Sequence, residues 1–174
     1  VMETTTVSSA FSFIDTPGCT DQCYIAFLSN KLGKRVDGMH HLFAIEKDAP
    51  AQSELLDHPS KPACLFPELN SFWKPDVLSK IRDLQSRGAV VDLCSMVPII
   101  KSGQAIVGSA YCKVHNQYCQ AKRANIHRAG IPCLAFSPFG NQDTLQGSSM
   151  DAIGAWAGQR RLLQEEVLIV EESD

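Results

Sequence analysis

The chain has 174 residues, of which 44% are hydrophobic and 20% charged, a composition typical of one soluble domain with a core of its own. No apolar run approaches the roughly 20 residues that span a bilayer, and the amino terminus lacks the basic region of a signal peptide. The net charge of −3 argues against a nucleic-acid partner, and seven irregularly spaced cysteines indicate a reducing, intracellular compartment.

The first elements form a strand, a turn and a helix. Aromatic and β-branched residues predict a strand over Phe11–Asp15, and small residues with a proline predict a turn over residues 16–21. A helical stripe of apolar residues follows from Gln22 to Leu32, and Gly33 ends it. This order places a helix amino terminus against a polar cofactor in nucleotide-binding folds.

A carboxylate follows the second predicted strand, His41–Ile45. In nucleotide-binding folds a carboxylate at this position accepts hydrogen bonds from ribose hydroxyls, and Glu46 is the candidate. The alternative is a structural role, in which Asp48 caps the helix predicted over residues 49–56. Both interpretations can hold, with Glu46 on a ribose and Asp48 on the cap.

The middle of the chain gives weaker patterns. A short third strand is predicted within Lys61–Phe66, and a helix over Pro75–Ser86 has a proline at its start and Gly88 after its end. Residues 89–94 fit an extra strand or a buried loop, and residues 95–111 are predicted to be irregular.

A stretch rich in cysteine and histidine comes next. Cys112, His115 and Cys119 have a spacing that could ligate zinc, but a fourth ligand at the usual spacing is missing. On a helix these three residues would simply share one face. We therefore expect no metal site.

The chain is organised around a cysteine that follows a proline. A strand is predicted over Ala124–Gly130, and Pro132 cannot continue it, so Cys133 is expected as the first side chain beyond the strand's carboxyl end. A helix from residue 147 to 164 and a continuous apolar strand over Val167–Val170 follow, and such a run is typical of the middle of a parallel sheet. Glu171 then lies at the same sheet edge as Cys133.

The surroundings of Cys133 are basic. No acidic residue lies between Asp92 and Asp143, whereas five basic residues do: Lys101, Lys113, Lys122, Arg123 and Arg128. This local charge would attract phosphate and lower the pKa of a thiol, although a solvated loop explains it equally well.

The segment Gly-x-Pro-Cys-x-x-Phe-Ser-x-x-Gly, from Gly130 to Gly140, resembles the catalytic loop of DNA cytosine-5 methyltransferases. In that family the cysteine is the nucleophile, which assigns this role to Cys133, and Val170-Glu171 resembles the motif of the catalytic glutamate. Glu172 and Ser173 replace the Asn and Val of that motif.

The resemblance also implies a set of cofactor-binding residues. The turn from Asp15 to Asp21 is similar to the motif that wraps the methionine end of S-adenosylmethionine, although only Gly18 remains of its usual glycines. Glu46 matches the glutamate on the cofactor ribose, and Glu68 the acidic residue that faces the adenine amine. The implied cofactor-binding residues are Asp15, Gly18, Thr20, Asp21, Glu46, Glu68 and Pro132.

The resemblance implies an α/β fold, the Rossmann-like fold of S-adenosylmethionine-dependent methyltransferases, with a mostly parallel sheet flanked by helices. Residues 1–174 would be one incomplete catalytic domain without a target-recognition domain. The expected partner is DNA with a flipped cytosine, in the nucleus if the source is eukaryotic, and no membrane.

Three alternatives remain open at this point. Relatives that methylate tRNA share the catalytic loop, so RNA is the nearest alternative substrate. A degenerate domain that only binds a nucleotide or a protein is the second. A cysteine hydrolase that uses Cys133 with His127 or His115 is the third, although no Asn or Asp orients a histidine at useful spacing.

Overall fold

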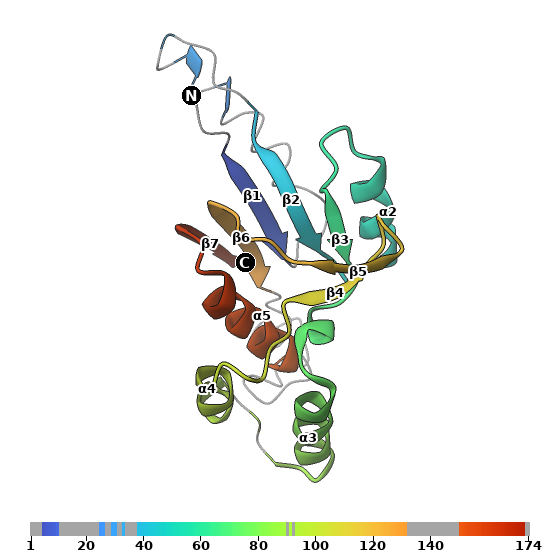
Figure 1. The fold of residues 1–174 in the computed structure, drawn as a ribbon, viewed down its shortest axis with the longest axis vertical. Helices are drawn as coiled ribbons and strands as arrows, with labels where there is room; N and C mark the ends of the chain where they lie inside the picture. The colour runs from blue at the N-terminus through green and yellow to red at the C-terminus, as the bar shows by residue number, and fades with distance from the viewer. Residues whose placement is uncertain are drawn as a thin grey trace.

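The computed structural model describes residues 5–10, 25–26, 29–30, 33, 38–89, 91, 93–131 and 150–172. Its centre is a five-stranded sheet in the order β3-β2-β1-β6-β7, in which every neighbouring pair of strands is parallel (Figure 1). The strands are β1 (Thr6–Ala10), β2 (His40–Ile45), β3 (Cys64–Phe66), β6 (Ile126–Ile131) and β7 (Val167–Glu172). The predicted α/β class with a mostly parallel sheet is therefore confirmed, and the strand order is compatible with a Rossmann-like fold.

Residues 25–26 and 29–30 are helical, within the helix predicted from Gln22 to Leu32, and four further α-helices and one short 3-10 helix accompany the sheet in the described part of the chain. They are α2 (Ala49–Asp57), η1 (Leu69–Phe72), α3 (Pro75–Ser86), α4 (Leu93–Lys101) and α5 (Met150–Leu163). The predicted helices at α2, α3 and α5 are confirmed. Asp48 caps α2 as expected, because its Oδ2 accepts the backbone N–H of Ala51 at 3.1 Å. Among the described helices, none is both long and apolar enough to cross a membrane.

The structure differs from the sequence prediction between residues 89 and 120. Helix α4 occupies much of the stretch predicted as a strand or irregular chain, and a two-stranded antiparallel hairpin follows it. The hairpin consists of β4 (Ser109–Cys112) and β5 (Gln117–Gln120), and Asn116 in its turn has a positive φ of 52°. Cys112, His115 and Cys119 therefore lie on a hairpin, and the interpretation that they share a helix face is wrong.

The first and last strands of the described chain, β1 and β7, also differ from the sequence prediction. The described first strand, β1, comes before the strand predicted over Phe11–Asp15, which lies outside the described residues. Strand β7 is confirmed as a strand, but among the described strands it pairs with β6 alone, so it forms the edge of the described sheet and not its middle. Its four apolar residues, Val167 to Val170, are 36–48% exposed.

The core lies where the ends of β2 and β3 meet η1 and the start of α5. Phe66 makes edge-to-face contacts with Phe43 and Phe72, with ring centroids 5.8 and 5.2 Å apart. Trp73 is buried, and its indole N–H donates to the Asp151 carbonyl at 2.8 Å. These contacts fix η1 and α5 next to the carboxyl ends of the strands.

Helix α5 packs closely because it carries glycine where it meets the chain that follows α4. A Cβ on Gly158 would lie 2.5 Å from Ile106 Cγ1 and 2.8 Å from Ile106 Cδ1. We expect Gly158→Ala to lower the free energy of unfolding by about 1–3 kcal/mol, because the overlap outweighs the gain in helix propensity. Urea unfolding measures this, with Gly38→Ala as the control, since a Cβ there meets nothing within 4 Å. Equal stability of the two variants would contradict the close packing.

Candidate functional site at the carboxyl ends of the strands

The parallel strands of the sheet end on one side, where Glu46 follows β2 and Glu68 follows β3. The arrowheads of β1, β2, β3 and β6 in Figure 1 point the same way, so the segments that follow these strands leave from a common side. Strand β1 has β2 on one side and β6 on the other, and the order of connections reverses between β1 and β6. Open α/β sheets bind their ligands at this type of crevice.

Glu46 is buried at the end of β2 with one carboxylate oxygen unused. The residue is 6% exposed, and its Oε1 accepts the backbone N–H of Asp48 at 2.8 Å. No described residue donates to Oε2, which is buried. Burial raises the pKa of Glu46, although backbone N–H groups of Asp48 and Lys47 act in the opposite direction. A buried acceptor without a donor is costly, so a ligand hydroxyl at this atom would be stabilising.

The backbone around Glu46 is held from two sides. Its N–H donates to the Phe66 carbonyl at 3.1 Å, which extends the pairing of β2 with β3, and its carbonyl accepts from Gln52 Nε2 at 2.6 Å. The Lys113 ammonium in the hairpin turn donates in turn to Gln52 Oε1. The Glu46 carboxylate is therefore presented by a rigid backbone.

The end of β3 carries a second group of polar side chains. Glu68 is half-buried and makes no side-chain cap bond to η1. Asn70 donates from Nδ2 to Asp151 Oδ2 at 2.9 Å, while its Oδ1 is buried and receives no donor from any described residue. Burial raises the pKa of Asp151, and the nearby Glu68 carboxylate acts in the same direction. Asn70 and Asp151 were not predicted as site residues, since neither lies in a motif.

Strand β6, which precedes Cys133 in the chain, and strand β7, which contains Glu171, are neighbours. In the parallel pair β6–β7, Gly130 lies opposite Glu171. Strand β6 ends at Ile131, immediately before Pro132 and one residue beyond the predicted end at Gly130. Cys133 and the side chain of Glu171 lie outside the described residues, as do the cofactor candidates Asp15, Gly18, Thr20, Asp21 and Pro132.

The surroundings of His127 indicate a structural role for this residue. It is fully buried in β6, its Nδ1 is 2.8 Å from Ser8 Oγ, and its Nε2 accepts the indole N–H of Trp156 at 3.0 Å. This pattern requires the proton on Nδ1, which donates to the serine. Burial, helped by the charges of Arg160 and His41, lowers the pKa of His127 to about 2. His127 therefore does not provide the base that the cysteine-hydrolase hypothesis requires.

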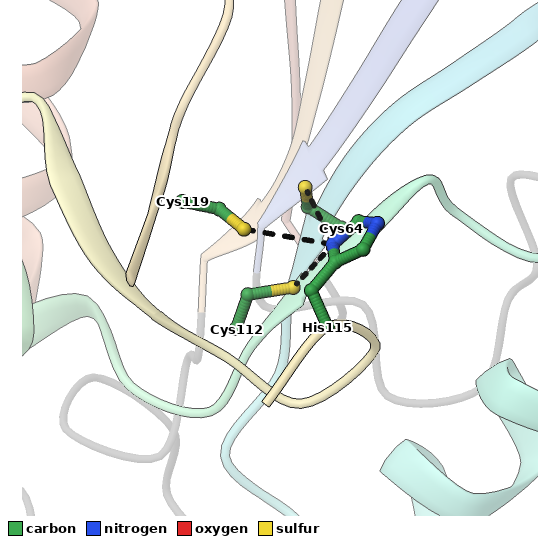
Figure 2. A group of neighbouring side chains, drawn as sticks. All are labelled: Cys64, Cys112, His115 and Cys119. Atoms are coloured by element: carbon green, nitrogen blue, oxygen red, sulfur yellow. Dashed lines mark hydrogen bonds between the residues drawn. The ribbon is translucent and has the colours of Figure 1, made fainter. Parts of the chain in front are cut away.

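The structure brings a fourth residue to the three on the hairpin. Cys64, the first residue of β3, lies beside Cys112, His115 and Cys119, and all four side chains point toward one another (Figure 2). Burial and the neighbouring thiols raise the pKa of Cys64 to about 12. Burial also acts to raise the pKa of Cys112, but hydrogen bonds from His115 and from the backbone of Leu65 and Val114 lower it to about 7. Cys64 is the member of this group that the sequence spacing did not reveal.

None of the protein-family models matches the chain, and the comparison with curated proteins finds no similar sequence. The fold and the two groups of side chains described above are therefore the evidence from which its function is inferred.

Proposed function

We propose that this chain binds S-adenosylmethionine and transfers the methyl group to carbon-5 of cytosine in DNA. The observation that carries the proposal is Oε2 of Glu46, a buried acceptor without a donor among the described residues, just past the end of β2. Rossmann-like sheets bind ribose hydroxyls with a carboxylate at this place. Asn70 Oδ1, just past the end of β3, is a second buried acceptor of this kind.

Adenosine has the donors that these acceptors lack. Its ribose supplies two hydroxyl groups for Glu46, and its exocyclic amine supplies N–H groups for the end of β3, where Glu68 and Asn70 lie. These strand ends are neighbours, because Ile45 lies opposite Phe66 in the β2–β3 pair. One adenosine lying across two adjacent strand ends would therefore account for both acceptors.

The charge at these strand ends favours a cofactor without phosphate groups. Glu46 and Asp48 follow β2, and Glu68 lies close enough to Asp151 to affect its pKa. Carboxylates in such number disfavour a pyrophosphate and favour a cation. S-adenosylmethionine combines adenosine with a sulfonium cation, and when bound it supplies the methyl group for transfer.

The resemblance of the loop from Gly130 to Gly140 implies that Cys133 is the nucleophile, and that of Val170-Glu171 implies that Glu171 is the catalytic glutamate. The Cys133 thiolate would form a bond to carbon-6 of cytosine, which makes carbon-5 nucleophilic. The Glu171 carboxyl would hydrogen-bond to the ring nitrogen and stabilise the charge that develops there. Carbon-5 would then take the methyl group as its bond to the sulfonium sulfur breaks, which leaves S-adenosylhomocysteine. Loss of the carbon-5 proton to water would expel the Cys133 thiolate and restore the ring. The adjacency of β6 and β7 supports this pairing of residues.

Calorimetric titration with S-adenosylhomocysteine tests the proposal. We expect binding by the unmodified chain and a roughly 10- to 100-fold weaker affinity in Glu46→Gln, since a hydrogen bond to a charged group is worth about 1.5–3 kcal/mol. Glu54→Gln is the matched control, because Glu54 is exposed on α2. A folded chain that does not bind, or equal affinity in both variants, would contradict the assignment.

A further inference from the structure

Four metal-ligating side chains converge at the junction of the hairpin with the sheet. Cys112 ends β4, His115 lies in the turn, Cys119 lies in β5, and Cys64 begins β3 (Figure 2). Their sulfur and Nδ1 atoms all lie within 4.8 Å of one another. Two segments far apart in the sequence thus supply one compact group of three thiols and one imidazole.

The distances within this group fit a tetrahedral metal ion. His115 Nδ1 is 3.5 Å from the sulfurs of Cys112 and Cys119, and 3.8 Å from that of Cys64. A zinc ion about 2.3 Å from sulfur and about 2.0 Å from nitrogen separates these ligand atoms by about 3.5 Å. An ion at the centre would therefore need little movement of the side chains.

Hydrogen bonding alone does not explain the arrangement. The neutral imidazole has a single lone pair at Nδ1, so this nitrogen accepts one thiol proton at most. Three sulfurs nevertheless surround it at similar distances. None of the four described cysteines forms a disulfide. A cation at the centre would engage all three sulfurs and the nitrogen at once.

We propose that Cys64, Cys112, His115 and Cys119 bind one Zn²⁺ ion. Three thiolates and one imidazole favour zinc over the hard cations calcium and magnesium. Four protein ligands complete a tetrahedral shell and leave no position for substrate, so the site is structural. The proposal does not depend on the proposed function, and it supplies the fourth ligand that the sequence pattern lacked.

The role of the ion follows from the hairpin it would hold. An isolated two-stranded hairpin has marginal stability, and Tyr118 in β5 is 77% exposed. The Lys113 N–H donates to the Leu65 carbonyl at 2.8 Å, and its ammonium donates to Gln52, which holds the Glu46 backbone. Zinc would fix the hairpin to β3 and thereby keep Lys113 in place beside the end of β2.

Metal analysis of the purified chain tests this proposal without cofactor or nucleic acid. After reduction and reconstitution with zinc, we expect about one zinc per chain, and less than about a tenth of this in Cys64→Ser. Cys94→Ser is the matched control and should keep the full amount, because Cys94 is exposed on α4, outside the cluster. Full zinc content in Cys64→Ser, or equal loss in both variants, would overturn the proposal.

Cobalt substitution keeps the test decisive if Cys64→Ser does not fold. The unmodified chain loaded with Co²⁺ should show intense tetrahedral d–d bands and sulfur-to-metal charge-transfer absorption. His115→Cys should still bind the ion and shift these bands, because it converts the ligand set to four thiolates. Spectra of octahedral cobalt, or no bound metal in the unmodified chain, would refute the site.

Discussion

Replacing Cys133 by alanine is expected to lower the rate of methyl transfer to cytosine by at least about 10⁴-fold, because the reaction begins with addition of this sulfur to the ring. The full reading frame that encodes this chain is assayed with duplex DNA and labelled S-adenosylmethionine. DNA that contains 5-fluorocytosine provides a second measurement. Fluorine at carbon-5 blocks the loss of a proton, so the unmodified protein should remain covalently attached to the DNA.

The controls separate the possible functions. Cys94→Ala should retain both activities, since this cysteine is exposed on α4. A covalent adduct that persists in Cys133→Ala would contradict the assigned nucleophile. An adduct with tRNA in place of DNA would identify RNA as the substrate. Binding of S-adenosylhomocysteine without any adduct would identify a degenerate binding domain.

Acid is expected to destabilise the protein through His127. This histidine is held neutral between Ser8 and Trp156, and its pKa in the folded state is about 2. In the unfolded chain the pKa returns to about 6.5, so between these two values the unfolded state binds the extra proton. Stability therefore falls as the pH drops below about 6.5, with a contribution of about 2 kcal/mol between pH 7 and pH 5.

Urea unfolding at several pH values measures this contribution. The stability of His127→Gln should be lower at pH 7, because the bonds to Ser8 and Trp156 are altered, but it should fall less on acidification. His40→Gln is the control, since His40 is exposed at the start of β2. The hypothesis fails if His127→Gln and the unmodified chain lose equal stability between pH 7 and pH 5.

Caps, prolines and glycines in the sequence correctly predicted the helices that begin or end at them. Strand β2, the Asp48 cap and α2 follow one another as expected, and α3 begins at a proline and ends before Gly88, whose φ is 76°. Helix α4 was missed because Pro98 lies inside it. Tertiary contacts stabilise α4, because Met96 is buried against α5. The contact is so close that a Cβ on Gly154 would lie 2.5 Å from the Met96 sulfur.

Which strands pair and which distant side chains meet was harder to predict than where the helices and strands lie in the sequence. The apolar run of β7 correctly indicated a strand, but such a pattern says nothing about how many strands pair with it. The proposed zinc site shows the same limit. Three of its side chains lie within one hairpin, whereas Cys64 comes from β3, which the sequence presents as an ordinary short core strand. Only the tertiary fold brings it to the others.

The two distant segments of the cluster have a consequence for the architecture. Helices η1, α3 and α4 lie between Cys64 and Cys112, so a bound ion would join the two ends of a lobe of about 50 residues. The tip of this lobe, at residues 87–89, is exposed. Insertions at the tip should be tolerated, because doubling a flexible loop costs only about 0.6 kcal/mol once its base is closed. Evolution could thus vary the lobe in length while the sheet and its strand ends stay unchanged.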